Sequence, residues 1–293
     1  MRAPRRAVRR PLVLAPAVAL LALAAASAHA GATSSQHPAR PPAPAGPFAS
    51  TAMAAFLKTR AGAVTAAAYN IKTKRLFIYN PSQHGDDASI AKVDILATAL
   101  YEAQQRGTGL TPLEQELAEG AIENSDNDDA QSLWEIDGGN AAIAAFNARV
   151  GMTQTILDPQ GAWGLYESTA RDQILLLEHI ALHNDVLSDA SREYELDLMH
   201  NVESDQDWGV SGGVLAPATV ALKNGWLPVG GGWEINSIGQ VSGRYRDYLL
   251  AVLTSDDASM PYGVETIEGI SQLVWSYFLP QRFQPGAPQG HGI

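Results

Sequence analysis

Residues 119–130 have the sequence Glu-Gly-Ala-Ile-Glu-Asn-Ser-Asp-Asn-Asp-Asp-Ala, and Ser125-Asp126-Asn127 at its centre has the largest influence on the fold prediction. The tripeptide lies between helices predicted at 112–122 and 128–136, so it occupies an interhelix loop that can direct a hydroxyl and an amide into a cleft. The alternative is simple helix capping, because Ser, Asp and Asn all favour helix starts. At average residue usage this tripeptide is expected in only ~4% of chains of this length, so related motifs are worth seeking.

A second motif, Ser89-Ile90-Ala91-Lys92, stands at the start of a helix predicted at 89–106. Its three-residue spacing places the serine and the lysine on one helix face. A serine hydroxyl needs a base to act as a nucleophile, and a buried lysine can serve when desolvation lowers its pKa. Free N–H groups at the helix start would also stabilise an oxyanion. The alternative is an N-cap serine with an exposed lysine, since Ser-x-x-Lys occurs about once by chance in such a chain.

A third motif, Lys223-Asn224-Gly225, ends a strand predicted at 220–226. A lysine at a strand edge could bind a substrate carboxylate, and a glycine lets a ligand approach the backbone closely. The alternative is an ordinary strand end followed by a turn.

The predicted elements place strands at both ends of the folded region and helices in the middle. Hydrophobic periodicity predicts a helix at 49–61, strands at 64–70 and 75–79, helices at 89–106, 112–122, 128–136, 141–150, 168–184 and 188–201, strands at 220–226, 233–241 and 247–254, and a helix at 262–277. The simplest packing is one five-stranded, mostly antiparallel sheet flanked by the terminal helices, with an all-helical lobe beside it. A cleft between the two is the expected place for a site.

The three motifs occur in this order, each in the structural context that its chemistry needs. On these residues the chain resembles the penicillin-recognising serine hydrolases, and specifically the class A β-lactamases. Residues 119–130 are similar to that family's helix and loop, and residues 168–172 (Ser-Thr-Ala-Arg-Asp) are similar to the start of a later helix. The resemblance covers about residues 48–277. It implies an α/β (α+β) fold of the β-lactamase/transpeptidase type, reduced in size.

The resemblance implies catalytic roles for three side chains. Ser89 would be the acylated nucleophile, and Lys92 would be its base or a proton relay. Ser125 would pass a proton to the leaving nitrogen. The backbone N–H groups of Ser89 and Trp226 would form the oxyanion hole, with no metal or other cofactor.

Four further residues would bind the substrate. Asn127 would hold its amide side chain, and Lys223, with Asn224 and Gly225 next to it, would bind its carboxylate. Asn224 stands where the family has Thr or Ser, so an amide replaces a hydroxyl that touches the substrate carboxylate.

One catalytic group of the family has no counterpart in this sequence. Class A β-lactamases have a glutamate that activates the deacylating water. The corresponding residues 158–164 are Asp-Pro-Gln-Gly-Ala-Trp-Gly, without a matching glutamate. Glu167 falls too late and is interpreted as a first-turn helix acid. In addition, Ser89 and Ser125 are only 36 residues apart, which predicts a trimmed helical lobe.

The N-terminal sequence predicts export. Five arginines precede an apolar run at 12–26 and the cleavage-like Ala28-His29-Ala30, so residues 1–30 are interpreted as a signal peptide. The alternative is a retained membrane anchor, although the run is shorter than the ~20 residues that span a bilayer. Residues 31–47 predict a Pro/Ala-rich linker and 284–293 a flexible tail. Between them, a domain at 48–283 would divide into a sheet lobe (48–86 and 215–283) and a helical lobe (87–214).

Composition excludes several classes of protein. The chain has no cysteine, which excludes disulfides, thiolate metal sites and a lipid-modified cysteine. Loss of five arginines with residues 1–30 changes the net charge from −11 to about −16, which disfavours nucleic-acid binding. We therefore expect a secreted or extracytoplasmic monomer, free of the membrane after signal cleavage, that acts on a small molecule.

The predicted function is an exported serine hydrolase that forms an acyl-enzyme through Ser89 on a β-lactam or a peptidoglycan-type acyl-peptide. The alternative is a non-catalytic or penicillin-binding relative that serves as an exported binding or scaffold protein. The environment of Lys92 separates the two hypotheses: burial within reach of Ser89 favours the enzyme, and exposure to solvent favours the binder.

Overall fold

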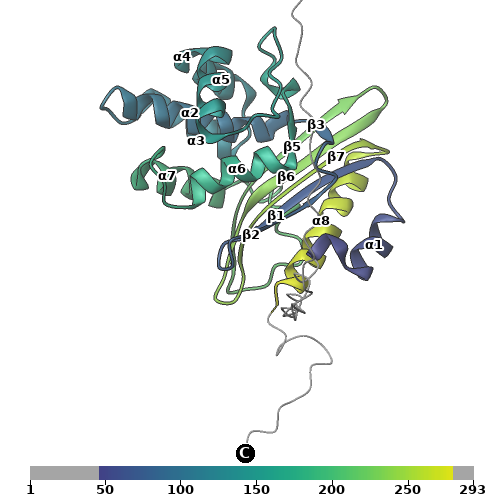
Figure 1. The fold of residues 1–293 in the computed structure, drawn as a ribbon. Coiled ribbons are helices and arrows are strands. Elements are labelled where there is room, and N and C mark those ends of the chain that lie inside the picture. Colours follow the sequence, from purple (N-terminus) through teal and green to yellow (C-terminus); the bar gives the residue numbers. More distant parts are fainter. Residues whose placement is uncertain (1–45, 280–293) are drawn as a thin grey trace, which may run out of the picture. The chain divides into compact units, whose positions relative to one another are not determined.

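The computed structural model of the chain describes residues 46–279. Its main sheet has the strand order β2-β1-β7-β6-β5 (Figure 1), and every neighbouring pair is antiparallel. The strands are β1 (Ala63–Asn70), β2 (Arg75–Tyr79), β5 (Thr219–Val229), β6 (Gly232–Ser242) and β7 (Asp247–Asp257). The predicted five-stranded antiparallel sheet is confirmed.

Eight helices and three short 3₁₀ turns accompany the sheet within the described residues. The helices are α1 (Thr51–Leu57), α2 (Ala91–Gln105), α3 (Pro112–Glu123), α4 (Asn127–Asp137), α5 (Gly139–Val150), α6 (Ala170–Ala181), α7 (Asp189–His200) and α8 (Met260–Tyr277). The turns are η1 (Pro47–Ala49), η2 (Ala88–Ile90) and η3 (Trp163–Leu165). The predicted α+β architecture, with strands at both ends of the described residues and helices between them, is therefore confirmed.

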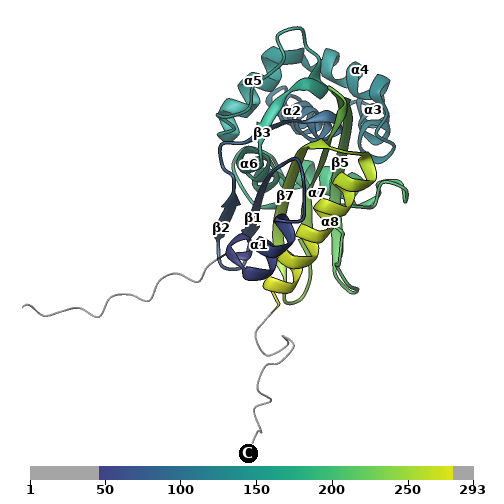
Figure 2. The same ribbon diagram turned by 90° about the vertical axis from the view of Figure 1, so that its right-hand side faces the viewer.

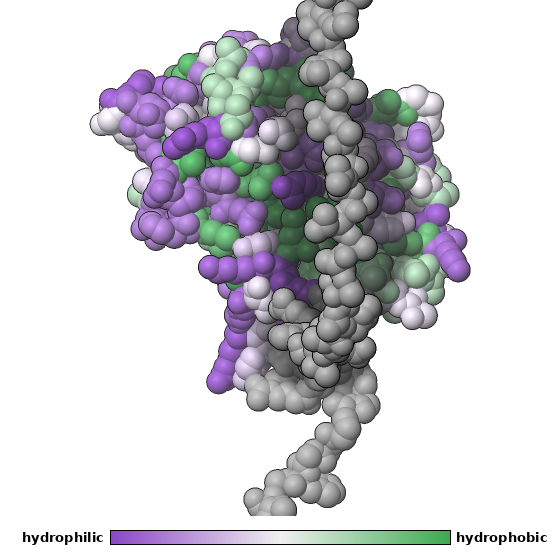
Figure 3. All heavy atoms as spheres, in the orientation of Figure 1, coloured by the Kyte–Doolittle hydropathy of each residue, from purple (hydrophilic) through white to green (hydrophobic). Residues whose placement is uncertain are grey.

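Alternation along the strands gives the sheet two apolar faces. In β7, Leu250 and Val252 point into a core shared with α1 and α8, whereas Leu249 and Ala251 point into a core shared with α2 to α7. Figures 1 and 2 show α1 and α8 on one face of the sheet and α6 on the other. Hydrophilic residues gather over the outer helices in the space-filling view (Figure 3).

Helix α2 is the central helix of the second core. Its sequence, rich in Ala and Leu, is buried at almost every position of its first ten residues. A helix that is buried all round also encloses its polar residues. Lys92 and Asp94 in its first turn are therefore 0% and 3% exposed.

The burial of Asp94 predicts a pH-dependent loss of stability. Burial raises the pKa of this carboxyl to about 7, and the neighbouring Asn147 amide acts in the opposite direction. The folded chain then holds a proton that the unfolded chain has released, so this contribution to stability is lost as the pH rises towards 7. Between pH 5 and pH 8, the free energy of unfolding should fall by about 1–3 kcal/mol less in Asp94→Asn than in the unaltered chain. Urea denaturation of both proteins at the two pH values measures this difference, and parallel pH profiles would contradict it.

A small second sheet was not predicted. Strands β3 (His84–Asp86) and β4 (Glu167–Thr169) pair antiparallel. The predicted helix at 168–184 is therefore wrong at its start, because the Thr169 side chain accepts the N–H of Asp172 and the helix begins at Ala170. The interpretation of Glu167 as a first-turn helix acid is also wrong, since Glu167 lies in β4 opposite Asp86.

Several predictions concern residues outside the described part. The predicted signal peptide (1–30), the linker (31–47, apart from Gly46 and Pro47) and the tail (284–293) lie there. The division into a sheet lobe and a helical lobe stays a prediction. Among the helices of residues 46–279, none has the length and apolar character needed to cross a membrane.

Candidate functional site

Ser89 lies in η2, immediately before α2, on a strained piece of backbone. Ala88 has a φ of 48°, the left-handed region that costs a residue with a side chain about 1–3 kcal/mol and is often found at functional sites. Ser89 caps neither η2 nor α2, so the capping alternative for this serine does not hold. Because Ser89 is among the first residues of a helical turn, its N–H has no intrahelical acceptor. Its side chain is partly exposed.

Lys92 is fully buried and bonded to the loop that contains Ser125. Its Nζ donates to Ser125 O at 2.6 Å, Ser125 Oγ at 3.2 Å and Asn127 Oδ1 at 2.8 Å. The exposed-lysine alternative is therefore excluded. Burial lowers the pKa of Lys92 to about 8, although Asp126 and Asp129 act in the opposite direction. Within the described residues Ser89 Oγ makes no hydrogen bond, and catalytic contacts of this kind often form only once substrate binds.

The three residues of the interhelix loop have different structural tasks. Asp126 caps α4, because its Oδ1 accepts the N–H groups of Asp128 at 2.8 Å and Asp129 at 3.0 Å. Ser125 has a φ of 58°, again in the left-handed region. The Asp126 cap and the left-handed turn at Ser125 place Ser125 and Asn127 in contact with Lys92. The tripeptide therefore both caps α4 and contributes to the candidate site.

Trp163 covers Lys92 on another side. Its ring centroid lies 5.2 Å from Lys92 Nζ, within the range of a cation–π contact. Its Nε1 donates to Gln131 Oε1 of α4 at 3.0 Å, which fixes the ring. Sequence reasoning did not single out Trp163 or Gln131, and no motif identifies a tryptophan that packs on a buried lysine.

Neither carboxylate of the region 158–167 reaches Lys92. Asp158 Oδ1 accepts the N–H groups of Gln160 and Ala162, so it caps its own loop. Glu167 is exposed in β4. Within the described chain, the carboxylates that act on Lys92 are Asp126 and Asp129, and no glutamate is among them.

Strand β5 brings Lys223 and Gly225 to the same site. The predicted strand end at Trp226 is wrong, since β5 continues to Val229 and the motif lies inside the strand. Lys223 is 0% exposed and its Nζ has no hydrogen-bond partner within the described residues. Burial, with a smaller contribution from nearby Lys92, lowers the pKa of Lys223 to about 7.

Gly225 permits close contact between β5 and η2. A Cβ at this position would lie 2.7 Å from Asp87 O and 2.9 Å from Ser89 N. The backbone of β5 therefore lies directly against η2 at Ser89. This proximity supports a shared oxyanion hole of the Ser89 and Trp226 N–H groups, which stays a prediction.

Gly225→Ala tests this contact. A methyl group at 2.7–2.9 Å from backbone atoms must push β5 away from η2, because neither neighbour is a flexible side chain. We expect a loss of about 1–3 kcal/mol in the free energy of unfolding and at least about tenfold slower acylation of Ser89. Gly109→Ala is the matched control, because no atom lies within 4 Å of its added Cβ. Equal acylation rates in the two variants would contradict the contact.

Asn224 is not brought together with the other predicted residues. Successive residues of a strand point to opposite faces, so Asn224 points away from the face of Lys223 and Gly225. Its Nδ2 donates to Gln206 O at 2.6 Å and Trp208 O at 3.1 Å, in the segment between α7 and β5. The amide therefore secures this segment, and we do not retain Asn224 as a substrate contact.

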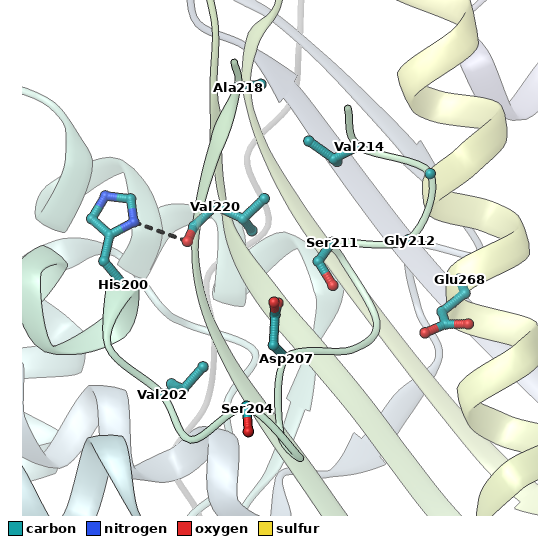
Figure 4. Close-up of a pocket in the computed structure, with 11 residues that line it drawn as sticks. His200, Val202, Ser204, Asp207, Ser211, Gly212, Val214, Ala218, Val220 and Glu268 are labelled. Atoms are coloured by element: carbon teal, nitrogen blue, oxygen red, sulfur yellow. Dashed lines mark hydrogen bonds between the residues drawn. The ribbon is translucent and has the colours of Figure 1, made fainter. Parts of the chain in front are cut away.

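The largest cavity among those described lies apart from these residues. It has a volume of about 680 Å³ and is formed by the end of α7, the segment that follows, β5 and α8 (Figure 4). His200 donates its Nδ1–H to Val220 O at 2.9 Å at one side, and Asp207 and Glu268 are also in the lining. No residue of the predicted acylation site lines this cavity.

Comparison with known proteins identifies the family. The model described as "Beta-lactamase enzyme family" matches residues 104–278. The chain belongs to the β-lactamase enzyme family. The matched range includes Ser125 and Lys223 but begins after Ser89 and Lys92.

Sequence relatives of this family member include a protein named "Putative lipoprotein LppW" from Mycobacterium tuberculosis and Mycobacterium bovis. It is 28% identical over 189 residues, which cover 59% of this chain and 57% of the relative. The chain thus spans less than two thirds of the length of these curated relatives.

Solved structures of class A β-lactamases share the fold. The extended-spectrum β-lactamase TLA-1 has a TM-score of 0.70 at 18% identity, with 78% of this chain and 96% of that chain covered. An ancestral class A β-lactamase (GNCA) has a TM-score of 0.66 at 24% identity, covering 76% and 97%. The class A β-lactamase from Bacteroides cellulosilyticus has a TM-score of 0.67 at 18% identity, with 75% of this chain and 93% of that chain covered. At these identities the likeness concerns the fold alone.

Proposed function

We propose that this β-lactamase family member acylates Ser89 with a β-lactam or a related cell-wall acyl-peptide that carries a carboxylate. The observation that supports this most strongly is the buried Lys92, bonded to Ser125 and Asn127 and held near a pKa of 8. A lysine in this state is neutral in a useful fraction of molecules near neutral pH and can accept a proton.

The geometry suggests a proton path. In neutral Lys92, two N–H groups donate to Ser125 O and Asn127 Oδ1, and the lone pair faces the Ser125 hydroxyl. Ser89 Oγ attacks the carbonyl carbon as its proton passes to Ser125 Oγ, and the Ser125 hydroxyl proton passes to the lone pair of Lys92 Nζ. Ser125 then gives its proton to the leaving nitrogen and receives one from Lys92. The C–N bond breaks, and the acyl group remains on Ser89 as an ester.

Two further groups complete the proposed site. Lys223 has a buried Nζ without an acceptor, which is costly unless a ligand supplies one, and a substrate carboxylate would do so. The N–H groups of Ser89 and Trp226 would stabilise the oxyanion. These features also disfavour the non-catalytic alternative, because a binding scaffold has no need for two buried lysines.

Hydrolysis of the ester is proposed to be slow. Trp163 lies over Lys92, and the carboxylates Asp158 and Glu167 are occupied or directed elsewhere. An extracytoplasmic location is also proposed, and the name of the lipoprotein relative supports it together with the sequence of residues 1–30.

The pH dependence of acylation tests the proposal. Above a pH of about 8 Lys92 is neutral, so the acylation rate at saturating penicillin should rise with pH and level off. Lys223 loses its proton above about 7, so the affinity for a carboxylate should fall over the same interval. Rapid-quench mass spectrometry between pH 6 and 10 separates the two parameters. A penicillin methyl ester should keep the rise in rate and lose the change in affinity, and a flat rate profile would exclude Lys92 as the base.

A further inference from the structure

A second cavity, of about 160 Å³, is lined by four carboxylates from four strands. Asp86 comes from β3, Glu167 from β4, Glu234 from β6 and Asp256 from the end of β7. We call it the acidic cavity. None of its residues has been given a role in the acylation of Ser89.

The carboxylates of the acidic cavity have no cationic partner within residues 46–279. The ion pairs of this part of the chain involve other acids. His84 also lines the cavity, but its Nε2–H is taken by Gln154 O at 2.9 Å. Arg60 acts on the neighbouring Asp257. Like charges therefore face one another without compensation, which is destabilising unless a ligand supplies positive charge.

Glu234 is the decisive residue, because it is only 8% exposed and its Oε2 has no hydrogen-bond partner. Burial raises the pKa of Glu234 to about 7, and Asp86, Asp256 and Asp257 raise it further, while the Asp86 N–H acts in the opposite direction. A buried carboxylate oxygen that lacks a partner, such as Glu234 Oε2, costs free energy that a hydrogen-bonded cation would recover. The backbone of Asp256, with a φ of 59°, is held in the left-handed region at the rim.

We propose that the acidic cavity binds a primary alkylammonium group, with Glu234 as its main partner. An ammonium has three N–H donors and no acceptor, which suits several carboxylates around one small space. The volume equals that of roughly five waters and accommodates the ammonium with its first methylenes. A bare metal ion fits less well, since no three acids of the described residues converge at ligand distances.

A bound ammonium would join two segments that flank the acylation site. Asp86 lies three residues before Ser89, and Glu167 follows the loop that contains Trp163. Neutralising both carboxylates would stabilise the pairing of β3 with β4. The proposal does not depend on whether Ser89 is acylated.

Calorimetric titration of the full chain at pH 8 tests the proposal with two probes. Nα-acetyl-lysine amide presents the ammonium on a peptide, and putrescine presents it on a free diamine. We expect saturable binding of at least one of them, and the tighter of the two identifies the source of the ammonium. Nα-acetyl-norleucine amide, which lacks the charge, should not bind. Glu234→Gln should weaken binding about ten- to hundredfold, whereas the matched surface variant Glu193→Gln should leave it unchanged.

The pH dependence provides a second measurement. As the pH falls from 8 to 5.5, Glu234 takes up a proton and the affinity should fall. The other titratable groups that face Glu234 are Asp86, Glu167, Asp256, Asp257 and His84. Absence of saturable binding, equal affinity in Glu234→Gln, or binding of Ca²⁺ in preference to both amines would overturn the proposal.

Discussion

Lys92→Met is expected to slow the acylation of Ser89 by about 10²–10⁴-fold, the range that a positioned general base contributes. Lys92 is the one basic side chain that the described structure bonds to both Ser125 and Asn127. Methionine has a similar length and no ionisable group, so the variant removes the base with little change in packing. Acylation of the variant is measured from the rate of mass increase with excess penicillin.

The control for this variant is Lys58→Met, which removes an exposed lysine at the end of α1. It should acylate at the unaltered rate. Lys92→Met leaves Ser125 O and Asn127 Oδ1 without this donor, which costs about 1–3 kcal/mol for each acceptor, so thermal unfolding is measured to establish that the variant is folded. Acylation of a folded Lys92→Met within about threefold of the unaltered rate would assign the base to another group.

The second large effect concerns the lifetime of the acyl-enzyme. We expect the ester on Ser89 to persist far beyond the roughly millisecond-to-second turnover times that are usual for enzymes. An ester needs an activated water for hydrolysis, and neither Asp158 nor Glu167 of the described residues is directed to Lys92. Trp163 and Gln131 are packed against that side instead.

The variant Glu167→Gln tests whether Glu167 affects the lifetime of the acyl-enzyme. Glu167 is the glutamate nearest in sequence to the missing family residue, but β4 places it opposite Asp86. Its replacement should therefore leave the lifetime of the acyl-enzyme unchanged. The lifetime is read by removing excess penicillin and following the adduct mass with time. An adduct that decays within seconds, or one that Glu167→Gln prolongs, would show that Glu167 activates water after all.

The sequence predicted the fold because its periodicities are strong. The apolar runs at 64–70 and 247–254 correspond to strands that are buried on both faces, and the helical pattern at 262–277 corresponds to α8 with one buried face. The pairing of β3 with β4 was not predicted, because a strand of three residues is too short to show an alternating hydrophobic pattern. Their pairing depends on a contact between segments about 80 residues apart.

The part of the candidate site that consists of short sequence motifs could be predicted from the sequence. Lys92 lies 33 residues before Ser125 and 35 before Asn127, yet the motifs led to residues that the fold brings together. Trp163 could not be found in this way, since its role depends on the ring position over Lys92. The left-handed backbone conformation of Ala88 could not be predicted from the sequence either, because alanine rarely adopts a positive φ.

Asn224 shows the limit of transferring roles by position. The sequence places it beside Lys223, and the resemblance implies a substrate contact. The strand alternation directs its amide to the other face, where Gln206 O and Trp208 O accept its hydrogen bonds. A motif position therefore defines a function only when the side chain also faces the site.

The most direct test of the central claim is intact-mass spectrometry of the purified chain with benzylpenicillin, beside Ser89→Ala. We expect a gain of one whole penicillin molecule, because ring opening releases no fragment. Peptide mapping should locate this adduct on Ser89, and the folded Ser89→Ala variant should gain no mass. A folded, unaltered chain that gains no mass, or a Ser89→Ala variant that still gains it, would contradict acylation at Ser89.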